Sequence, residues 1–149
     1  MATRAVADGS VATGLLIAVV LGVAVATATL GVLPPTPTVT AATLSVDGDR
    51  IVLVHRAGEA VDVRRLDLVV RVDGVPLRFQ PPVPFFAARG FRSGPTGPFN
   101  PATDSVWEVG ERASVRLAST NRPSIRAGAR VTVELRYAGR RLAVLSATA

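Results

Sequence analysis

The sequence contains no cysteine and only one histidine among its 149 residues. Without cysteine, neither a disulfide framework nor a thiolate metal site can form. The histidine, His55, has no Ser/Asp arrangement near it in the sequence, so we interpret it as a structural residue of a strand. Asp47-Gly48-Asp49 lacks the downstream acid of a calcium loop, and a hairpin turn explains it. We therefore expect no catalytic, cofactor-binding or metal site, and we predict that the protein is not an enzyme.

Lysine is also missing, so all 17 basic residues are arginine, against 11 acidic residues. Arg4 and Asp8 are the only charged residues before position 47, which leaves 16 arginines and 10 acidic residues in 47–149. This positive surplus favours contact with an anionic surface or an anionic glycan. The arginines are scattered rather than gathered in a block of five or six, so no specific nucleic-acid partner is predicted.

Charge is missing altogether from residues 11–33, a run of 23 residues made mostly of small and aliphatic side chains. As a helix it would measure about 34 Å, enough to cross the hydrocarbon core of a membrane. A cleaved secretory signal usually holds only about 7–15 apolar residues, although Ala24-Val25-Ala26 is of the type at which signals are cut. Three uses of the run are open: a removable signal, a retained membrane anchor, or a helix by which copies of the protein assemble.

Small residues recur at every fourth position within this run, at Gly14, Ala18 and Gly22. Such a ridge lets helices approach closely in an apolar medium, where van der Waals packing drives association. We predict that these three residues are the helix-packing and assembly positions.

A proline- and threonine-rich linker follows the run at residues 34–43. Its prolines cannot continue a helix and bias the chain toward an extended form, so we expect a semi-rigid spacer. In residues 44–149, apolar residues alternate with polar ones, as they do in strands that bury one face. The expected organisation is therefore an apolar helix, a spacer and a β head formed by residues 44–149.

Short alternating segments separated by Asp-Gly and Ala-Gly turn signals predict the strands of this head. In 66–72 and 130–137 every second residue is apolar, and the opposite face is mostly polar, with Val69 as the exception in 66–72. Seven or eight such strands without a convincing helix predict an antiparallel β-sandwich, Ig-like, or a small barrel. The expected strands are residues 43–46, 50–55, 66–72, 75–80, 112–119, 130–137 and 141–147.

The segment 80–106 is rich in proline and glycine and holds four of the five phenylalanines. A loop of this length is usually functional or disordered, and a disordered one would not be so rich in phenylalanine. Either the phenylalanines cover an open end of the sandwich, or part of the segment is a contact surface for a neighbouring subunit or an external target. Aromatic and arginine side chains are enriched at such surfaces, and the candidate contact residues are Phe85, Phe86, Arg89, Phe91 and Arg92.

Several short motifs occur in a particular order along the chain. Arg4-Ala5, a basic and a small residue, stand before Val6 and the long apolar run. The motifs of the head are Gly48-Asp49-Arg50-Ile51, Val54-His55-Arg56-Ala57-Gly58, Trp107-Glu108-Val109-Gly110 and Ile125-Arg126-Ala127-Gly128. In this order the chain resembles the archaeal type IV pilins, especially those of the haloarchaeal kind.

The resemblance implies a leader of residues 1–5, a cut by a prepilin peptidase between Ala5 and Val6, and a helix 6–33 that stays on the mature chain. It also implies a membrane location before assembly, then a cell-surface filament of like subunits built by the pilus assembly machinery. The expected function is that of a structural filament subunit with its β head exposed for adhesion. The alternative is a single-pass membrane-anchored, or secreted, extracellular β-sandwich binding module that does not polymerise.

Overall fold

The computed structural model describes residues 40–149. The expected leader 1–5, the expected helix 6–33 and most of the expected spacer lie outside this part. The expected processing and packing positions also lie outside it, namely Arg4, Ala5, Val6, Gly14, Ala18 and Gly22. Within residues 40–149, no helix has the length and apolarity needed to span a bilayer.

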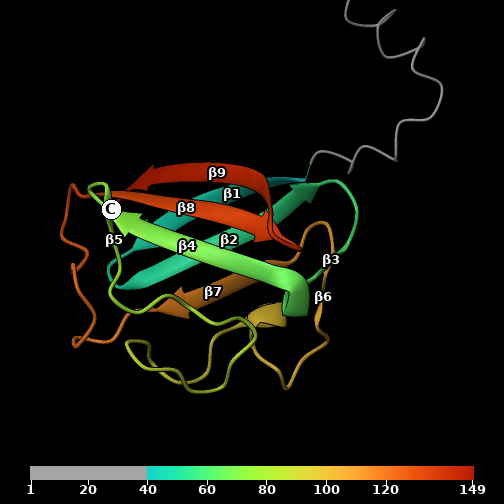
Figure 1. The fold of residues 1–149 in the computed structure, drawn as a ribbon, viewed down its shortest axis with the longest axis horizontal. Coiled ribbons are helices and arrows are strands. Elements are labelled where there is room, and N and C mark those ends of the chain that lie inside the picture. The colour runs from blue at the N-terminus through green and yellow to red at the C-terminus, as the bar shows by residue number, and fades with distance from the viewer. Residues whose placement is uncertain (1–39) are drawn as a thin grey trace, which may run out of the picture. The chain divides into compact units, whose positions relative to one another are not determined.

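Most of the strands belong to two antiparallel sheets (Figure 1). The first has the order β1-β2-β7, with bounds Ala41–Asp47, Arg50–Ala57 and Arg112–Arg116. The second has the order β5-β4-β8-β9, with bounds Val75–Pro76, Leu66–Val72, Arg130–Tyr137 and Arg140–Thr148. The remaining elements are the paired short strands β3 (Val61–Asp62) and β6 (Val106–Trp107) and the 3-10 turns η1 (Val63–Arg65) and η2 (Gly97–Phe99).

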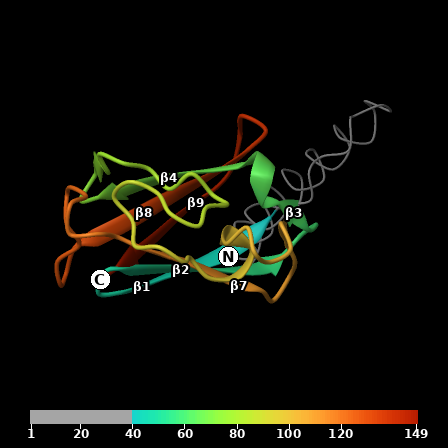
Figure 2. The same ribbon diagram turned by 90° about the horizontal axis from the view of Figure 1, so that it is seen from below.

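The two larger sheets lie in separate layers, which Figure 2 shows from a second direction. Apolar side chains of both sheets belong to one hydrophobic core, and Trp107 and Phe99 are the largest fully buried side chains in it. The prediction of a mainly β fold with antiparallel sheets is confirmed. The alternating apolar positions of β4 and β8 are buried as predicted, namely Leu66, Leu68, Val70, Val72, Val131, Val133 and Leu135.

Two of the hairpin turns have residues that suit their backbone geometry. Asp73 and Gly74 join β4 to β5 with φ of 49° and 81°, and Ala138 and Gly139 join β8 to β9 with φ of 48° and 80°. Two-residue loops with positive φ at both positions match the right-handed twist of the strands, and glycine adopts such values without steric cost. Both turns were expected from the sequence and are confirmed.

The expected strand 75–80 is much shorter than predicted, because β5 ends at Pro76. Beyond it, the side-chain amide of Gln80 takes the place of a strand partner for β4. Gln80 Oε1 accepts a hydrogen bond from the Val70 N–H at 2.7 Å, and Gln80 Nε2 donates to the Val70 carbonyl at 3.0 Å. The Val70 N–H is thus satisfied by a side chain, while the Val70 carbonyl also accepts a hydrogen bond from the Leu77 N–H at 3.0 Å.

Other boundaries differ from the expectation by a few residues. Because β1 begins at Ala41, residues 41–43 of the expected spacer belong to the first strand. Strand β7 ends at Arg116 rather than at residue 119. Strands β3 and β6 were not expected, since two residues are too few to show a period in the sequence.

Candidate functional site

Two of the short head motifs meet in the core, although His55 and Trp107 are 52 residues apart. Both side chains are fully buried, and their ring centroids lie 5.2 Å apart. His55 Nδ1 donates to the Trp107 carbonyl at 3.1 Å, because a carbonyl oxygen can only accept. The Gly110 N–H donates to the His55 carbonyl at 2.7 Å, and Trp107 Nε1 donates to the Glu111 carbonyl at 2.9 Å. These motifs therefore form a packed structural unit, in which His55 is a core residue.

The phenylalanines of the central segment mostly point into the core. Phe85 and Phe91 are each 6% exposed, with ring centroids 5.7 Å apart, and Phe99 packs on Trp107 at 5.8 Å. This arrangement agrees with the first of the two interpretations, a cover over the sandwich. The expected contact surface is corrected accordingly: Phe85 and Phe91 do not belong to it, because burial in the core removes them from the surface.

Three of the five expected contact residues are exposed. Phe86 is 63% exposed, and its carbonyl accepts a hydrogen bond from the Gly94 N–H at 2.8 Å. The Arg89 guanidinium lies 4.7 Å from the ring centroid of Phe79. Arg92 Nε lies 3.1 Å from Asp49 Oδ2, so Arg92 joins the central segment to the first hairpin.

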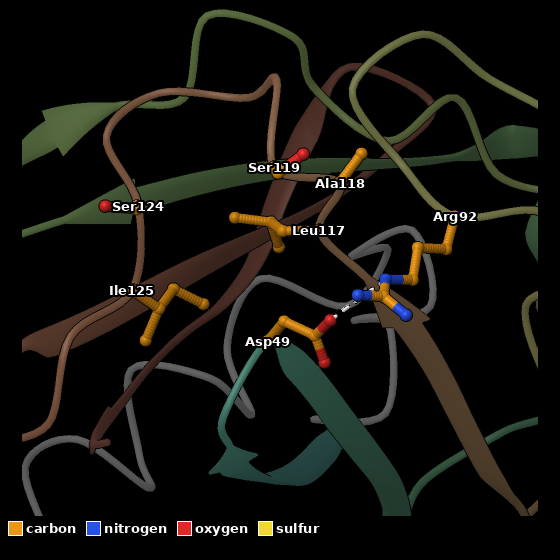
Figure 3. Close-up of a pocket in the computed structure, with 7 residues that line it drawn as sticks. All are labelled: Asp49, Arg92, Leu117, Ala118, Ser119, Ser124 and Ile125. Atoms are coloured by element: carbon orange, nitrogen blue, oxygen red, sulfur yellow. Dashed lines mark ion pairs between the residues drawn. The ribbon is translucent and has the colours of Figure 1, made fainter.

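Asp49 and Arg92, joined as an ion pair, both line a cavity of about 240 Å³ (Figure 3). The second oxygen of this carboxylate, Oδ1, lies 3.1 Å from Arg116 Nε in β7. One carboxylate thus ties together the first hairpin, the central segment and β7. The other residues that line the cavity are Leu117, Ala118, Ser119, Ser124 and Ile125.

Arg92 also lines a second hollow of about 200 Å³, which we call the arginine recess. Arg50 and Arg116 reach it from directly paired positions of β2 and β7. Sequence reasoning singled out Arg92 but missed these two, because no local pattern shows that strands so far apart in the chain are neighbours. The recess is lined by Arg50, Arg92, Ser93, Gly94, Pro95, Thr96, Ser114 and Arg116.

A second charge cluster lies on the outer face of the other sheet, around Glu134 in β8. The Glu134 side chain is 4% exposed and lies 2.7 Å from Arg136 Nε, 3.2 Å from Arg141 Nε and 3.5 Å from Arg71 Nη1. The hydrogen bond from Arg136 is the main cause that holds the pKa of Glu134 below its usual 4.5, while desolvation acts in the opposite direction. The arginines thus cover the carboxylate of Glu134 and favour its ionised form.

We expect Glu134→Gln to lower the stability of the protein at neutral pH and to flatten its decline in acid. A carboxyl group with a lowered pKa stabilises the fold above its unfolded pKa, and this contribution is lost as the pH falls through the folded pKa. Urea unfolding between about pH 7 and pH 3 measures the effect. Asp67→Asn is the matched control, since it removes an exposed carboxylate from the same face of neighbouring β4. An equal pH dependence in both variants would contradict the assignment.

In the described part of the chain, no three His, Cys, Asp or Glu side chains are grouped as a metal site requires. No protein-family model and no curated protein matches the sequence. The class that the described fold defines is a mainly β domain of antiparallel sheets.

Proposed function

We propose that the protein is a structural subunit of a type IV pilus-like surface filament. The observation that carries this proposal is the order of parts along the chain. Arg4-Ala5 precede an uncharged run of 23 residues, a proline-rich spacer follows, and the first strand begins at Ala41. In the proposed mature chain, a helix of residues 6–33 lies in the filament core and the β head is exposed for adhesion.

Packing is the proposed mechanism of assembly. An apolar helix leaves lipid only where like helices bury it equally well, and small residues permit the close approach that this requires. Gly14, Ala18 and Gly22 supply such residues at every fourth position. A prepilin peptidase would first remove residues 1–5, and the membrane would hold the subunit until the assembly machinery takes it up.

The head supports the proposal through the residues that carry the resemblance to pilins. His55 and Trp107 belong to two of the resembling motifs, and they pack against each other in the core. In this chain the two motifs therefore build the head rather than carry out a reaction, which is compatible with a structural subunit. A filament subunit needs this kind of self-contained, well-packed domain.

The alternative is an anchored or secreted β-sandwich binding module that does not polymerise. The arginine recess favours a binding role for the head, and that role is compatible with either proposal. The two proposals differ in what happens to the apolar run after synthesis. An experiment in two parts tests this difference.

The first part reads the N-terminus of the mature protein by mass spectrometry. We expect the chain to begin at Val6, as after prepilin-peptidase cleavage. An intact N-terminus would favour a simple anchor. A start near Thr27, Thr29 or Thr43 would mean that the run is removed, and the filament proposal would then fail.

The second part compares surface filaments by electron microscopy in cells that carry variants of the run. Gly14→Leu with Gly22→Leu is expected to abolish filaments but not membrane insertion, because leucine keeps the run apolar and blocks close helix approach. Val20→Leu with Ala24→Leu is the control, since these positions fall on the opposite side of an ideal helix. Filaments of normal number in the glycine variant would contradict the packing mechanism.

A further inference from the structure

The arginine recess lies on the face of the first sheet that points away from the core. Ile51 and Val115 are 2% and 1% exposed and belong to the core. Because successive side chains of a strand point to opposite faces, their neighbours Arg50 and Arg116 lie on the outer face. Arg92 completes the group from the central segment.

The recess carries a surplus of positive charge. Asp49 is the one carboxylate within ion-pair distance of its arginines in residues 40–149, at 3.1 Å from both Arg92 Nε and Arg116 Nε. Arg50 makes no ion pair in the described chain, although Asp47 stands opposite it in β1. Three arginines against Asp49 and the neighbouring Asp47 leave a surplus of one positive charge.

Arg50 and Arg116 place two like charges at directly paired positions. The two residues are direct partners in the β2–β7 ladder, and like charges in such positions destabilise a sheet. An anionic group placed between them would replace this repulsion with two attractive contacts. Planar guanidinium groups bind carboxylates and tetrahedral oxyanions with paired hydrogen bonds.

A pair of hydroxyl groups supplies one further donor on the wall of the recess. Thr96 Oγ1 and Ser114 Oγ lie 2.6 Å apart, and Ser114 is only 4% exposed. Each hydroxyl has one hydrogen, so their mutual bond leaves one hydrogen for a ligand. The backbones of the two residues also exchange hydrogen bonds, at 3.0 Å and 3.3 Å, which hold this wall against β7.

We propose that the arginine recess binds the sulfate or carboxylate group of an acidic polysaccharide. Its volume of about 200 Å³ is below the roughly 300–1,000 Å³ of a site for a drug-sized molecule, so it takes one charged group rather than a whole ligand. Pro95 is the one apolar side chain of the lining. Such a lining suits a charged group that is attached to a polar molecule. The recess lies wholly within the described head, so the proposal does not rest on polymerisation of the chain.

The lining favours a polysaccharide over a nucleic acid. Proteins that bind single strands combine a row of phosphate contacts with aromatic side chains on which the bases stack. No aromatic side chain lines the recess. The arginines nearest to Glu134, by contrast, lie on the other sheet and do not extend the recess into a track.

Binding of the full chain in a nonionic detergent to immobilised polysaccharides tests the proposal. The probes are dextran sulfate and alginate, with uncharged dextran and a single-stranded oligothymidylate as comparisons. We expect the wild type to bind at least one acidic polysaccharide, and Arg50→Gln to weaken that binding about tenfold. Arg140→Gln removes the same charge from exposed β9 and is expected to change the affinity less than about twofold.

Two further measurements separate a specific site from a general charge effect. Arg50→Gln is expected to leave the melting temperature unchanged or raised, because it relieves the repulsion with Arg116. Thr96→Val with Ser114→Ala keeps the net charge and is expected to weaken binding by several-fold. Equal losses in Arg50→Gln and Arg140→Gln would overturn the proposal, as would failure to bind either acidic polysaccharide or equally tight binding of the oligothymidylate.

Discussion

Replacing Trp107 with alanine is expected to lower the free energy of unfolding by about 4 kcal/mol, a typical cost for deleting a buried tryptophan. Its side chain is fully buried between His55 and Phe99, with centroid distances of 5.2 Å and 5.8 Å. The change leaves a cavity between these rings and removes the indole hydrogen bond to the Glu111 carbonyl. Urea unfolding followed by circular dichroism measures the loss, since Trp107 is the one tryptophan and its fluorescence disappears with it.

Phe86→Ala is the control for this prediction. It also removes a large aromatic side chain, but Phe86 is 63% exposed, so we expect a change within about 0.5 kcal/mol. A loss in Trp107→Ala no larger than in Phe86→Ala would show that the cluster of His55 and Trp107 does not hold the head together.

Gly97→Ala is expected to cost about 3 kcal/mol and to detach part of the central segment from β7. Gly97 has a φ of 65°, which side-chain-bearing residues rarely adopt, and an added methyl group would overlap the Arg112 carbonyl. Because that carbonyl is part of the β7 backbone, it cannot move aside without disturbing the first sheet. Urea unfolding gives the cost, and limited proteolysis of residues 85–100 reports the detachment.

Gly94→Ala separates the cost of the positive φ from the cost of the overlap with the β7 backbone. Gly94 has a similar φ of 76°, but nothing lies within 4 Å of the added methyl group. The variant therefore carries the backbone strain alone, and we expect a loss of about 1 kcal/mol. Equal losses in the two variants would mean that the close approach of Gly97 to β7 contributes nothing.

Much of the fold can be predicted from local patterns. Strands β4 and β8 begin and end where the alternation of apolar residues predicts, because a strand that buries one face must place its apolar side chains at every second position. The turns at Asp73-Gly74 and Ala138-Gly139 could also be predicted, since short hairpin loops favour residues that tolerate positive φ. These signals lie within a few residues of the feature that they specify.

The candidate sites could be predicted only in part. The sequence indicates Arg92 as a candidate by its place in a loop rich in phenylalanine and glycine. The other two arginines of the recess, Arg50 and Arg116, come from strands β2 and β7. Glu134 stands at an outward position of β8, where a charged residue is ordinarily solvated. It is nonetheless nearly fully buried, because arginines from β4, β8 and β9 fold over it.

The sequence by itself determined the alternating strands, their tight turns, and the uncharged run of 23 residues with its proline-rich continuation. Each of these depends on neighbouring residues and on the chemistry of single side chains. Only the tertiary structure decided that Phe85 and Phe91 are core residues while Phe86 is exposed. It alone brought three arginines to one recess, because the pairing of β2 with β7 joins segments about sixty residues apart and leaves no local trace.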